Sequence, residues 1–132
     1  MSLINFYFMA VLLLSPNKIE KEETDIIADE IVTATTYKPT SEETDSTPNI
    51  TASGFKISKK NPKKHRIIAI SRDLKKRFKF GSRVRIKGAG KYSGEYVVQD
   101  VMNKRYRKRI DILINPKDKQ TTIKNVKLYK VI

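Results

Sequence analysis

The sequence predicts an all-β fold with little helix, a small β-barrel. Several short apolar runs, separated by turn residues, follow one another along the 132-residue chain. This spacing is typical of barrels and sandwiches built from short strands. Charged and apolar side chains also alternate, as in RVRI at residues 83–86. Such alternation fits strands with one face in a core and the other in solvent.

The first half of the chain predicts two strands and one helical turn. Residues 30–37 (EIVTATTY) are rich in β-branched side chains and form the first strand. Residues 38–51, rich in Ser, Thr, Pro and Asp, form a loop. Residues 66–70 are an apolar run suited to a buried strand. Ser71 can then cap a brief helix that ends at Phe78.

The second half predicts four more strands. Residues 83–86 and 95–99 form two of them, joined by a loop with three glycines. Residues 110–114 and 123–132 form the last two. With the two strands of the first half, about six strands are expected, enough to close a small barrel.

The charge of the chain is divided unevenly between its two ends. Residues 1–50 carry a net charge of −6 and residues 51–132 carry +20, which gives +14 for the chain. A field this positive favours a polyanionic partner: nucleic acid, an anionic cell-wall polymer or an acidic membrane surface. Cysteine is absent, which excludes disulfides, thiol chemistry and cysteine-based zinc sites.

The N-terminus begins with an apolar run, LINFYFMAVLLL, at residues 3–14. A membrane-spanning helix needs about 20 such residues, so this run has instead the length of a signal-peptide apolar region. We expect a protein exported to the cell envelope, the periplasm or the outside of the cell. The expected organisation is a signal peptide or membrane tether (1–16), a polar linker (17–30) and one domain (31–132).

Two carboxylates, Asp100 and Asp111, bound the most cationic segment of the chain, QDVMNKRYRKRID at residues 99–111. Asp111 lies between isoleucines in an apolar strand, where an unpaired carboxylate is costly. Asp100 follows another apolar strand. The connection between this strand and the strand of Asp111 is long enough for the two strand ends to lie close together. Two carboxylates in one cleft repel, so one can keep its proton near neutral pH, as in glycosidic-bond cleavage. The alternative is that each aspartate only neutralises a neighbouring arginine of residues 105–109.

Five segments of the chain carry a family resemblance. They are VTATTY (32–37), TPNITASG (47–54), IAISRDL (68–74), FGSRVRIKG (80–88) and VVQDVMNKRYRKRIDI (97–112). In this order they resemble the three-aspartate (3D) domain family, which includes MltA-type lytic transglycosylases and small muralytic, stationary-phase-survival proteins. The most specific match is the eleven-residue spacing of Asp100 and Asp111. The resemblance implies a double-psi β-barrel over residues 31–132.

The resemblance also implies an activity, cleavage of the β-1,4 bond between N-acetylmuramic acid and N-acetylglucosamine in peptidoglycan. Asp111 matches the family's acid/base, and Asp100 would raise its pKa or orient it. The first family aspartate aligns with Ser71, and Asp73, two residues later, is a candidate replacement. Two of the matching segments contain a Thr-Ala element, at residues 33–37 and 51–54. The substrate-binding residues that these two elements imply are Thr36, Tyr37, Thr51, Ser53 and Gly54. The expected protein is a monomer that uses no metal and no cofactor.

The expected partners are peptidoglycan glycan strands and anionic wall polymers, with no nucleic acid. Two alternative functions stay open. The family's glycine-rich link after the second aspartate is replaced here by residues 101–107, so the domain could bind cell walls without cleaving them. A nucleic-acid-binding barrel would need aromatic rings among the basic residues of one face, and Tyr92, Tyr96 and Tyr106 partly meet that condition. The leader argues against this second alternative.

Overall fold

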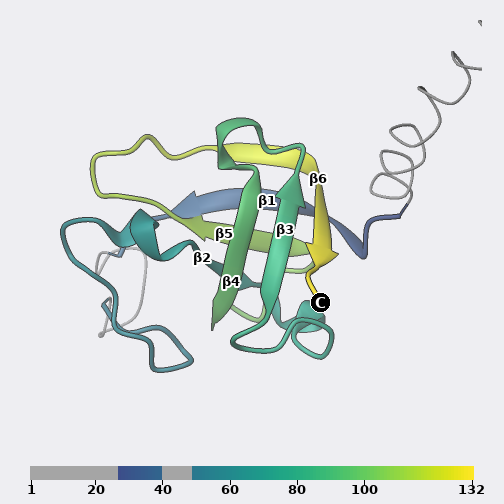
Figure 1. Ribbon diagram of the computed structural model, residues 1–132, viewed down its shortest axis with the longest axis horizontal. Coiled ribbons are helices and arrows are strands. Elements are labelled where there is room, and N and C mark those ends of the chain that lie inside the picture. The colour runs from purple at the N-terminus through teal and green to yellow at the C-terminus, as the bar shows by residue number, and fades with distance from the viewer. Residues whose placement is uncertain (1–26, 40–48) are drawn as a thin grey trace, which may run out of the picture.

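Six strands close into a barrel in a computed structural model that describes residues 27–39 and 49–132. The strands are β1 (Glu30–Tyr37), β2 (Ile67–Ile70), β3 (Arg83–Lys87), β4 (Gly94–Val101), β5 (Arg109–Leu113) and β6 (Thr122–Lys130). Around the barrel their order is β1-β5-β2-β4-β3-β6 (Figure 1). The prediction of a mostly β fold with a barrel of about six strands is confirmed.

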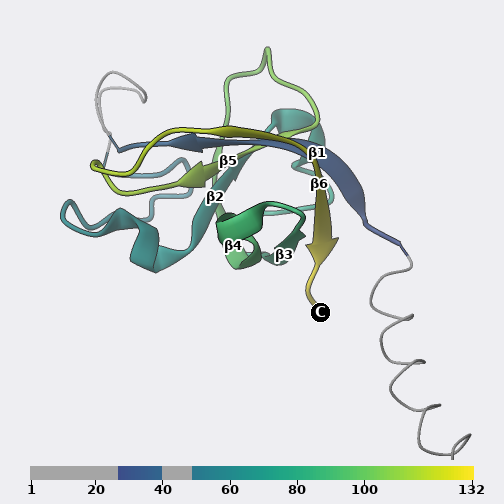
Figure 2. The ribbon, with the colours of Figure 1, turned by 90° about the horizontal axis from the view of Figure 1, so that it is seen from above.

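Parallel and antiparallel pairs both occur in this barrel. β1 pairs in parallel with β5, and β2 pairs in parallel with β4. The other four pairs are antiparallel. β2 therefore lies between β4 and β5, and the strands that carry Asp100 and Asp111 are not neighbours. The connection between β4 and β5, light green in Figure 2, projects from the barrel.

Helical structure in the described residues is limited to three 3-10 turns: η1 (Pro62–His65), η2 (Arg72–Leu74) and η3 (Gly90–Tyr92). The predicted helix from Ser71 to Phe78 is therefore wrong beyond its first turn. Ser71 forms no side-chain cap, and its hydroxyl instead accepts a hydrogen bond from the Arg109 N–H at 3.0 Å. Leu74 and Phe78 are nevertheless both buried in the core.

The barrel interior is filled by the inward-facing residues of all six strands. They are Val32, Ala34, Ile68, Ile70, Val84, Ile86, Tyr96, Val98, Ile110, Ile112, Val126 and Leu128, joined by Leu74, Phe78 and Ala89. Successive side chains of a strand face opposite sides of a sheet. In β5 this alternation buries Ile110 and Ile112 and directs Asp111 outward.

A second, smaller apolar cluster covers part of the outer wall. Its members are Tyr37, Ile57, Ile67, Ala69, Met102 and Leu113, with Phe55 and Tyr106 packed against them. These residues come from the outer faces of β1, β2 and β5, from residues 55–57 and from the β4–β5 connection. The cluster fixes these segments against the barrel at the place where the aspartates lie.

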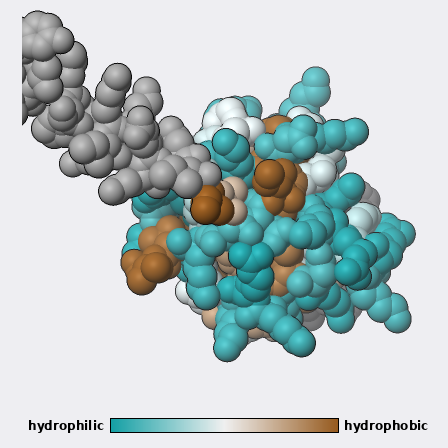
Figure 3. Space-filling view, turned by 90° about the vertical axis from the view of Figure 1, so that its right-hand side faces the viewer, coloured by the Kyte–Doolittle hydropathy of each residue, from teal (hydrophilic) through white to brown (hydrophobic). Residues whose placement is uncertain are grey.

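The surface of the molecule is hydrophilic over most of the face shown in Figure 3. The large apolar side chains exposed among the described residues are Ile27, Ile31, Ile50 and Ile132. Within the same residues, no helix is both long enough and apolar enough to cross a membrane. The predicted leader, residues 1–16, lies outside the described residues.

Candidate active site

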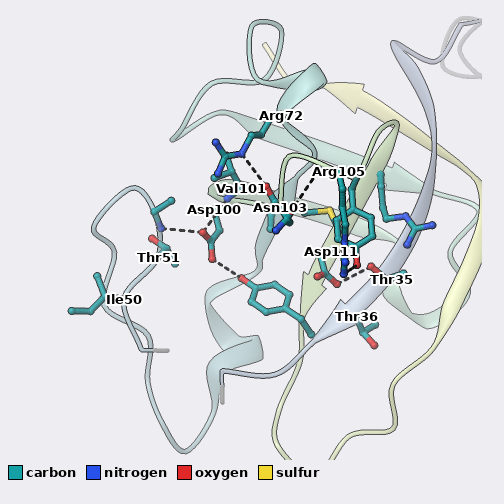
Figure 4. A pocket seen from close by; sticks show the side chains of 16 residues that line it. Thr35, Thr36, Ile50, Thr51, Arg72, Asp100, Val101, Asn103, Arg105 and Asp111 are labelled. Atoms are coloured by element: carbon teal, nitrogen blue, oxygen red, sulfur yellow. Dashed lines mark hydrogen bonds between the residues drawn. The ribbon is translucent and has the colours of Figure 1, made fainter. Parts of the chain in front are cut away.

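A cleft of about 750 Å³ lies on the outer wall of the barrel. Its lining comes from β1, β5, β2 and β4, from residues 50–52 and from the β4–β5 connection. Both Asp100 and Asp111 are among its lining residues (Figure 4). A cleft of this size is in the range that binds small ligands or segments of a polymer.

Asp100 and Asp111 belong to one row of residues that crosses three strands. Ala69 of β2 pairs with Asp100 of β4 on one side and with Asp111 of β5 on the other. Adjacent strands are spaced by about 4.8 Å, so the two aspartate backbones are about 10 Å apart. Ala69 contributes only a methyl group between them. The two aspartates therefore lie on strands separated by β2 and face the same cleft.

A β-bulge in β4 brings Asp100 to this cleft. Tyr96 and Val98 face the barrel interior, and regular alternation would send Asp100 inward as well. The pairing with β2 instead passes over Gln99, so that Val98 pairs with Ile68 and Asp100 pairs with Ala69. A bulge re-aims the side chains that follow it. The predicted strand end before Asp100 is wrong, since β4 continues through Val101.

Neutral donors contact Asp100 on both oxygens. The backbone N–H groups of Ala52 and Val101 donate to Oδ1 at 3.0 Å each. The Tyr37 hydroxyl donates to Oδ2 at 3.4 Å. These contacts fix the orientation of the carboxylate.

Tyr37 is a neutral hydrogen-bond donor in the cleft. Burial raises the pKa of Tyr37 well above its ordinary value, and the charges of Asp100 and Asp111 and the hydrogen bond to Asp100 raise it further. A neutral phenol can donate to a carboxylate, whereas a phenolate cannot. Tyr37 therefore stays protonated at neutral pH and senses both aspartates.

The second Thr-Ala element, residues 51–54, forms a turn that supports Asp100 from behind. The Ser53 hydroxyl donates to Gln99 Oε1 at 2.6 Å, and the Ser53 N–H donates to the Gln99 carbonyl at 3.2 Å. Gly54 has a φ of +89°, a conformation that L side chains rarely adopt. The turn presents the Ala52 N–H to Asp100.

Asp111 contacts a hydroxyl that suits either of its protonation states. Thr35, its partner in the β1–β5 register, has Oγ1 at 2.9 Å from Asp111 Oδ1 and at 3.3 Å from the Ile110 carbonyl oxygen. A hydroxyl has one proton to donate and two lone pairs to accept. Thr35 can donate to an ionised Asp111, or it can donate to Ile110 and accept from a protonated Asp111.

Asp73 is not among the residues that line the cleft. Its Oδ2 accepts a hydrogen bond from the Lys108 N–H at 3.0 Å. Burial favours the neutral form, but hydrogen bonds from Ser71, Lys108 and its own backbone, together with the charge of Arg107, outweigh burial and lower the pKa of Asp73. Asp73 is therefore an ionised anchor of the β4–β5 connection, and the structure does not bring it together with Asp100 and Asp111.

Three of the five predicted substrate-binding residues line the cleft: Thr36, Tyr37 and Thr51. Thr36 and Thr51 are mostly buried, and their hydroxyls accept hydrogen bonds at 3.0 Å from the N–H groups of Thr121 and Phe55. Ser53 and Gly54 are not lining residues, because they belong to the turn behind Asp100. These residues shape the cleft more than they offer groups to a ligand.

Sequence reasoning missed four residues that line the cleft: Thr35, Arg72, Arg105 and Arg109. Strand alternation was a usable signal for Thr35, because it puts Thr35, and not Thr36, on the face of Tyr37. Arg105 and Arg109 belong to the cationic segment 99–111, where they were considered only as partners that neutralise the aspartates, whereas Arg72 comes from a separate segment and had no such signal. Arg72 and Arg105 lie along one border of the cleft, above the two aspartates in the view of Figure 4.

No group of three or more metal-binding side chains is placed to hold a metal ion within residues 27–39 and 49–132. Comparison of the chain with family models, with curated proteins and with solved structures found no match.

Proposed function

We propose that the protein binds peptidoglycan glycan strands and cleaves the β-1,4 bond between N-acetylmuramic acid and N-acetylglucosamine, as a lytic transglycosylase. The observation that carries the proposal is the row formed by Asp100, Ala69 and Asp111 in the outer cleft. Enzymes that cleave glycosidic bonds use two carboxyl groups that flank the scissile bond. Ala69, which lies between the two aspartates in the strand register, adds only a methyl group to the cleft wall and does not block a sugar there.

Asp111 is the acid/base in this mechanism. Its protonated carboxyl donates a proton to the glycosidic oxygen while the bond from that oxygen to C1 of the muramyl residue breaks. The resulting carboxylate accepts the proton of the muramyl C6 hydroxyl, and the C6 oxygen forms a bond to C1. The product is a 1,6-anhydro sugar, and no water is consumed. Thr35 supports both states of Asp111 through its single hydroxyl.

Asp100 acts on this cycle by its charge. The hydrogen bonds from Tyr37, Ala52 and Val101 favour the ionised form of Asp100. A negative charge across the cleft favours the protonated form of Asp111 and stabilises positive charge that develops at C1. The two carboxyl groups thereby take different roles because their hydrogen-bond partners differ.

The proposal includes membership of the three-aspartate domain family and a double-psi arrangement of the barrel. A closed barrel of six strands with two parallel pairs, β1–β5 and β2–β4, supports that arrangement. It also includes residues 1–16 as an export signal or tether. A fusion of residues 1–30 to an export-dependent reporter should be active outside the cytoplasm, and a purely cytosolic signal would remove the claim of an envelope location.

The nucleic-acid-binding alternative loses one of its three aromatic rings. Tyr96 is 3% exposed, its hydroxyl donates to the Tyr92 carbonyl at 2.7 Å, and the Arg66 guanidinium lies 4.0 Å from its ring centre. A ring packed in this way cannot stack on a base. The non-catalytic wall-binding alternative uses the same cleft and differs only in turnover.

The test of the proposed function is incubation of the purified full chain with murein sacculi, followed by mass spectrometry of the soluble products. We expect muropeptides that end in 1,6-anhydro-N-acetylmuramic acid. Binding to sacculi without release of such products under any condition supports the wall-binding module in place of the enzyme. Products with a reducing N-acetylmuramic acid end would instead indicate hydrolysis by water.

A further inference from the structure

Three arginines share the cleft with the two aspartates. Arg72 follows β2, Arg105 belongs to the β4–β5 connection and Arg109 opens β5. The charged residues that line the cleft are thus three cations and two carboxylates. The cleft keeps a net positive charge even with both aspartates ionised, and this charge increases when Asp111 carries a proton. A cleft built only to hold a neutral sugar has no need of this excess.

Two of these arginines contact the same aromatic ring, that of Tyr106. The guanidinium carbons of Arg105 and Arg109 lie 4.8 and 5.1 Å from the centre of the Tyr106 ring. Arg105 Nη2 also donates to the Tyr106 hydroxyl at 2.7 Å. Each cation gains a favourable contact with the ring, while the two like charges repel each other. An anion bound near both guanidinium groups would relieve that repulsion.

The connection that carries Arg105 is anchored at both ends. At its start, the Met102 N–H donates to the Ile70 carbonyl at 2.8 Å, and Arg72 Nε donates to the Met102 carbonyl at 3.2 Å. At its end, the N–H groups of Lys108 and Arg109 donate to the side chains of Asp73 and Ser71, at 3.0 Å each. Because residues 70–73 hold both ends, the arginines lose less conformational freedom on binding than they would on an unanchored loop.

We propose that Arg72, Arg105 and Arg109 form a subsite for a carboxylate carried by the glycan that lies across Asp100 and Asp111. Guanidinium groups match the planar geometry of a carboxylate and can bind it through two parallel hydrogen bonds. In peptidoglycan such a carboxylate belongs either to the stem peptide or, on strands without peptides, to the lactyl group of muramic acid. The subsite rests on the proposed function for the identity of the glycan, and its chemistry is that of a carboxylate in either case.

The test is a comparison of affinities for glycan oligosaccharides of equal length. The reference probe is a neutral N-acetylglucosamine oligomer. The first pair is a peptide-free peptidoglycan glycan with free lactyl carboxylates and its methyl ester. The second pair is the same glycan with stem peptides, whose carboxylates are either free or amidated. Isothermal titration calorimetry at constant ionic strength gives each dissociation constant. We expect a free carboxylate, on the lactyl group or on the stem, to bind about tenfold tighter than its own ester or amide, as for one charge-assisted hydrogen-bond pair. The acid that shows this preference identifies which carboxylate the subsite takes.

Matched arginine variants locate the effect. Arg105→Gln and Arg109→Gln should each reduce the preference for the acid about three- to tenfold. Arg107→Gln is the control, because Arg107 is exposed on the same connection and does not line the cleft. Arg109→Lys keeps the charge but not the planar fork, and should give an intermediate preference. Melting temperatures within a few degrees of wild type show that each variant is folded.

Equal affinity for acid and ester in the wild type would overturn the subsite, and so would an equal loss in Arg107→Gln and Arg109→Gln. The proposed function has a separate readout, the release of anhydro-muropeptides by the wild type. A carboxylate preference without cleavage supports the subsite and contradicts the proposed cleavage activity. Cleavage without a carboxylate preference does the reverse.

Discussion

The inner and outer faces of the same barrel strands differ in how they are built. In β5, Ile110 and Ile112 face the interior, while Asp111 between them faces the cleft. The inner face depends on a periodic apolar pattern within each strand. The outer face depends on a row across three strands, a bulge in β4 and two connections that are distant in the sequence. Stability and chemistry should therefore respond to different substitutions, even at adjacent positions.

The largest expected effect on stability is at the inner face. Ile112 is 1% exposed, and Ile112→Ala should lower the free energy of unfolding by about 2–5 kcal/mol through lost burial and the cavity left behind. Urea denaturation of the two proteins measures this difference. A loss below about 1 kcal/mol would show that the interior is loosely packed and that the two faces do not differ in their contribution to stability.

A smaller loss is expected at the anchor of the outer connection. Asp73→Ala should lower the free energy of unfolding by about 1–2 kcal/mol, because the Lys108 N–H loses a charged acceptor. Since the pKa of Asp73 is lowered by its hydrogen bonds, its stabilisation is complete above its ordinary pKa of about 4 and is lost as the pH falls through the folded value. The gap between wild type and variant should close in acid. A gap that does not depend on pH would contradict the ionised anchor.

A similar or smaller loss is expected at Tyr37, which belongs to the cleft wall. Tyr37→Phe should cost about 0.5–1.5 kcal/mol for the hydrogen bond to Asp100. Because the folded pKa of Tyr37 is raised, its contribution is complete below about pH 10 and is lost as the pH rises through the folded value. Denaturation at several pH values should thus show a shallower alkaline decline in the variant. Identical declines would contradict a protonated donor in the cleft.

The barrel could be predicted from the sequence because its signal is local. Residues 30–37 form β1 with the bounds that their β-branched composition indicated, and the other five strands differ from expectation by a few residues. The helix after Ser71 could not be excluded from the local sequence, because the hydroxyl expected to cap it contacts a distant backbone group instead, the Arg109 N–H. A backbone partner 38 positions away leaves no trace in the local sequence.

The site was predictable only in part, because it also depends on contacts between residues that are distant in the sequence. Asp100 and Asp111 were expected in one cleft, and they do line one. Their separation by Ala69 and the bulge at Gln99 depend on strand order and register, which the period of the sequence does not encode. The sequence suggested only the arginines of residues 105–109 as partners of the aspartates. Arg72, which also lines the cleft, comes from a different segment.

The smallest expected effect on stability is at Thr35, whose hydroxyl should matter mainly for activity. Thr35→Val keeps the shape but cannot serve the two states of Asp111, so cleavage of murein should fall about three- to tenfold, as for one lost hydrogen bond. Thr35→Ser should restore most of it and should return the pH profile of cleavage to that of the wild type. An unchanged pH profile in Thr35→Val would leave Thr35 as a packing residue only.

The most direct test of the carboxylate pair is the release of anhydro-muropeptides from sacculi by Asp111→Asn, compared with Asp73→Asn. Both variants remove one negative charge from a half-buried aspartate, but only Asp111 lines the cleft. We expect Asp111→Asn to reduce release by about 10²- to 10⁴-fold, as for a lost general acid, while its free energy of unfolding stays within about 1 kcal/mol of wild type. Asp73→Asn should retain most of the activity. If Asp111→Asn releases anhydro-muropeptides at the wild-type rate and is less stable, Asp111 is a structural residue, and Asp100 and Asp111 do not perform the cleavage.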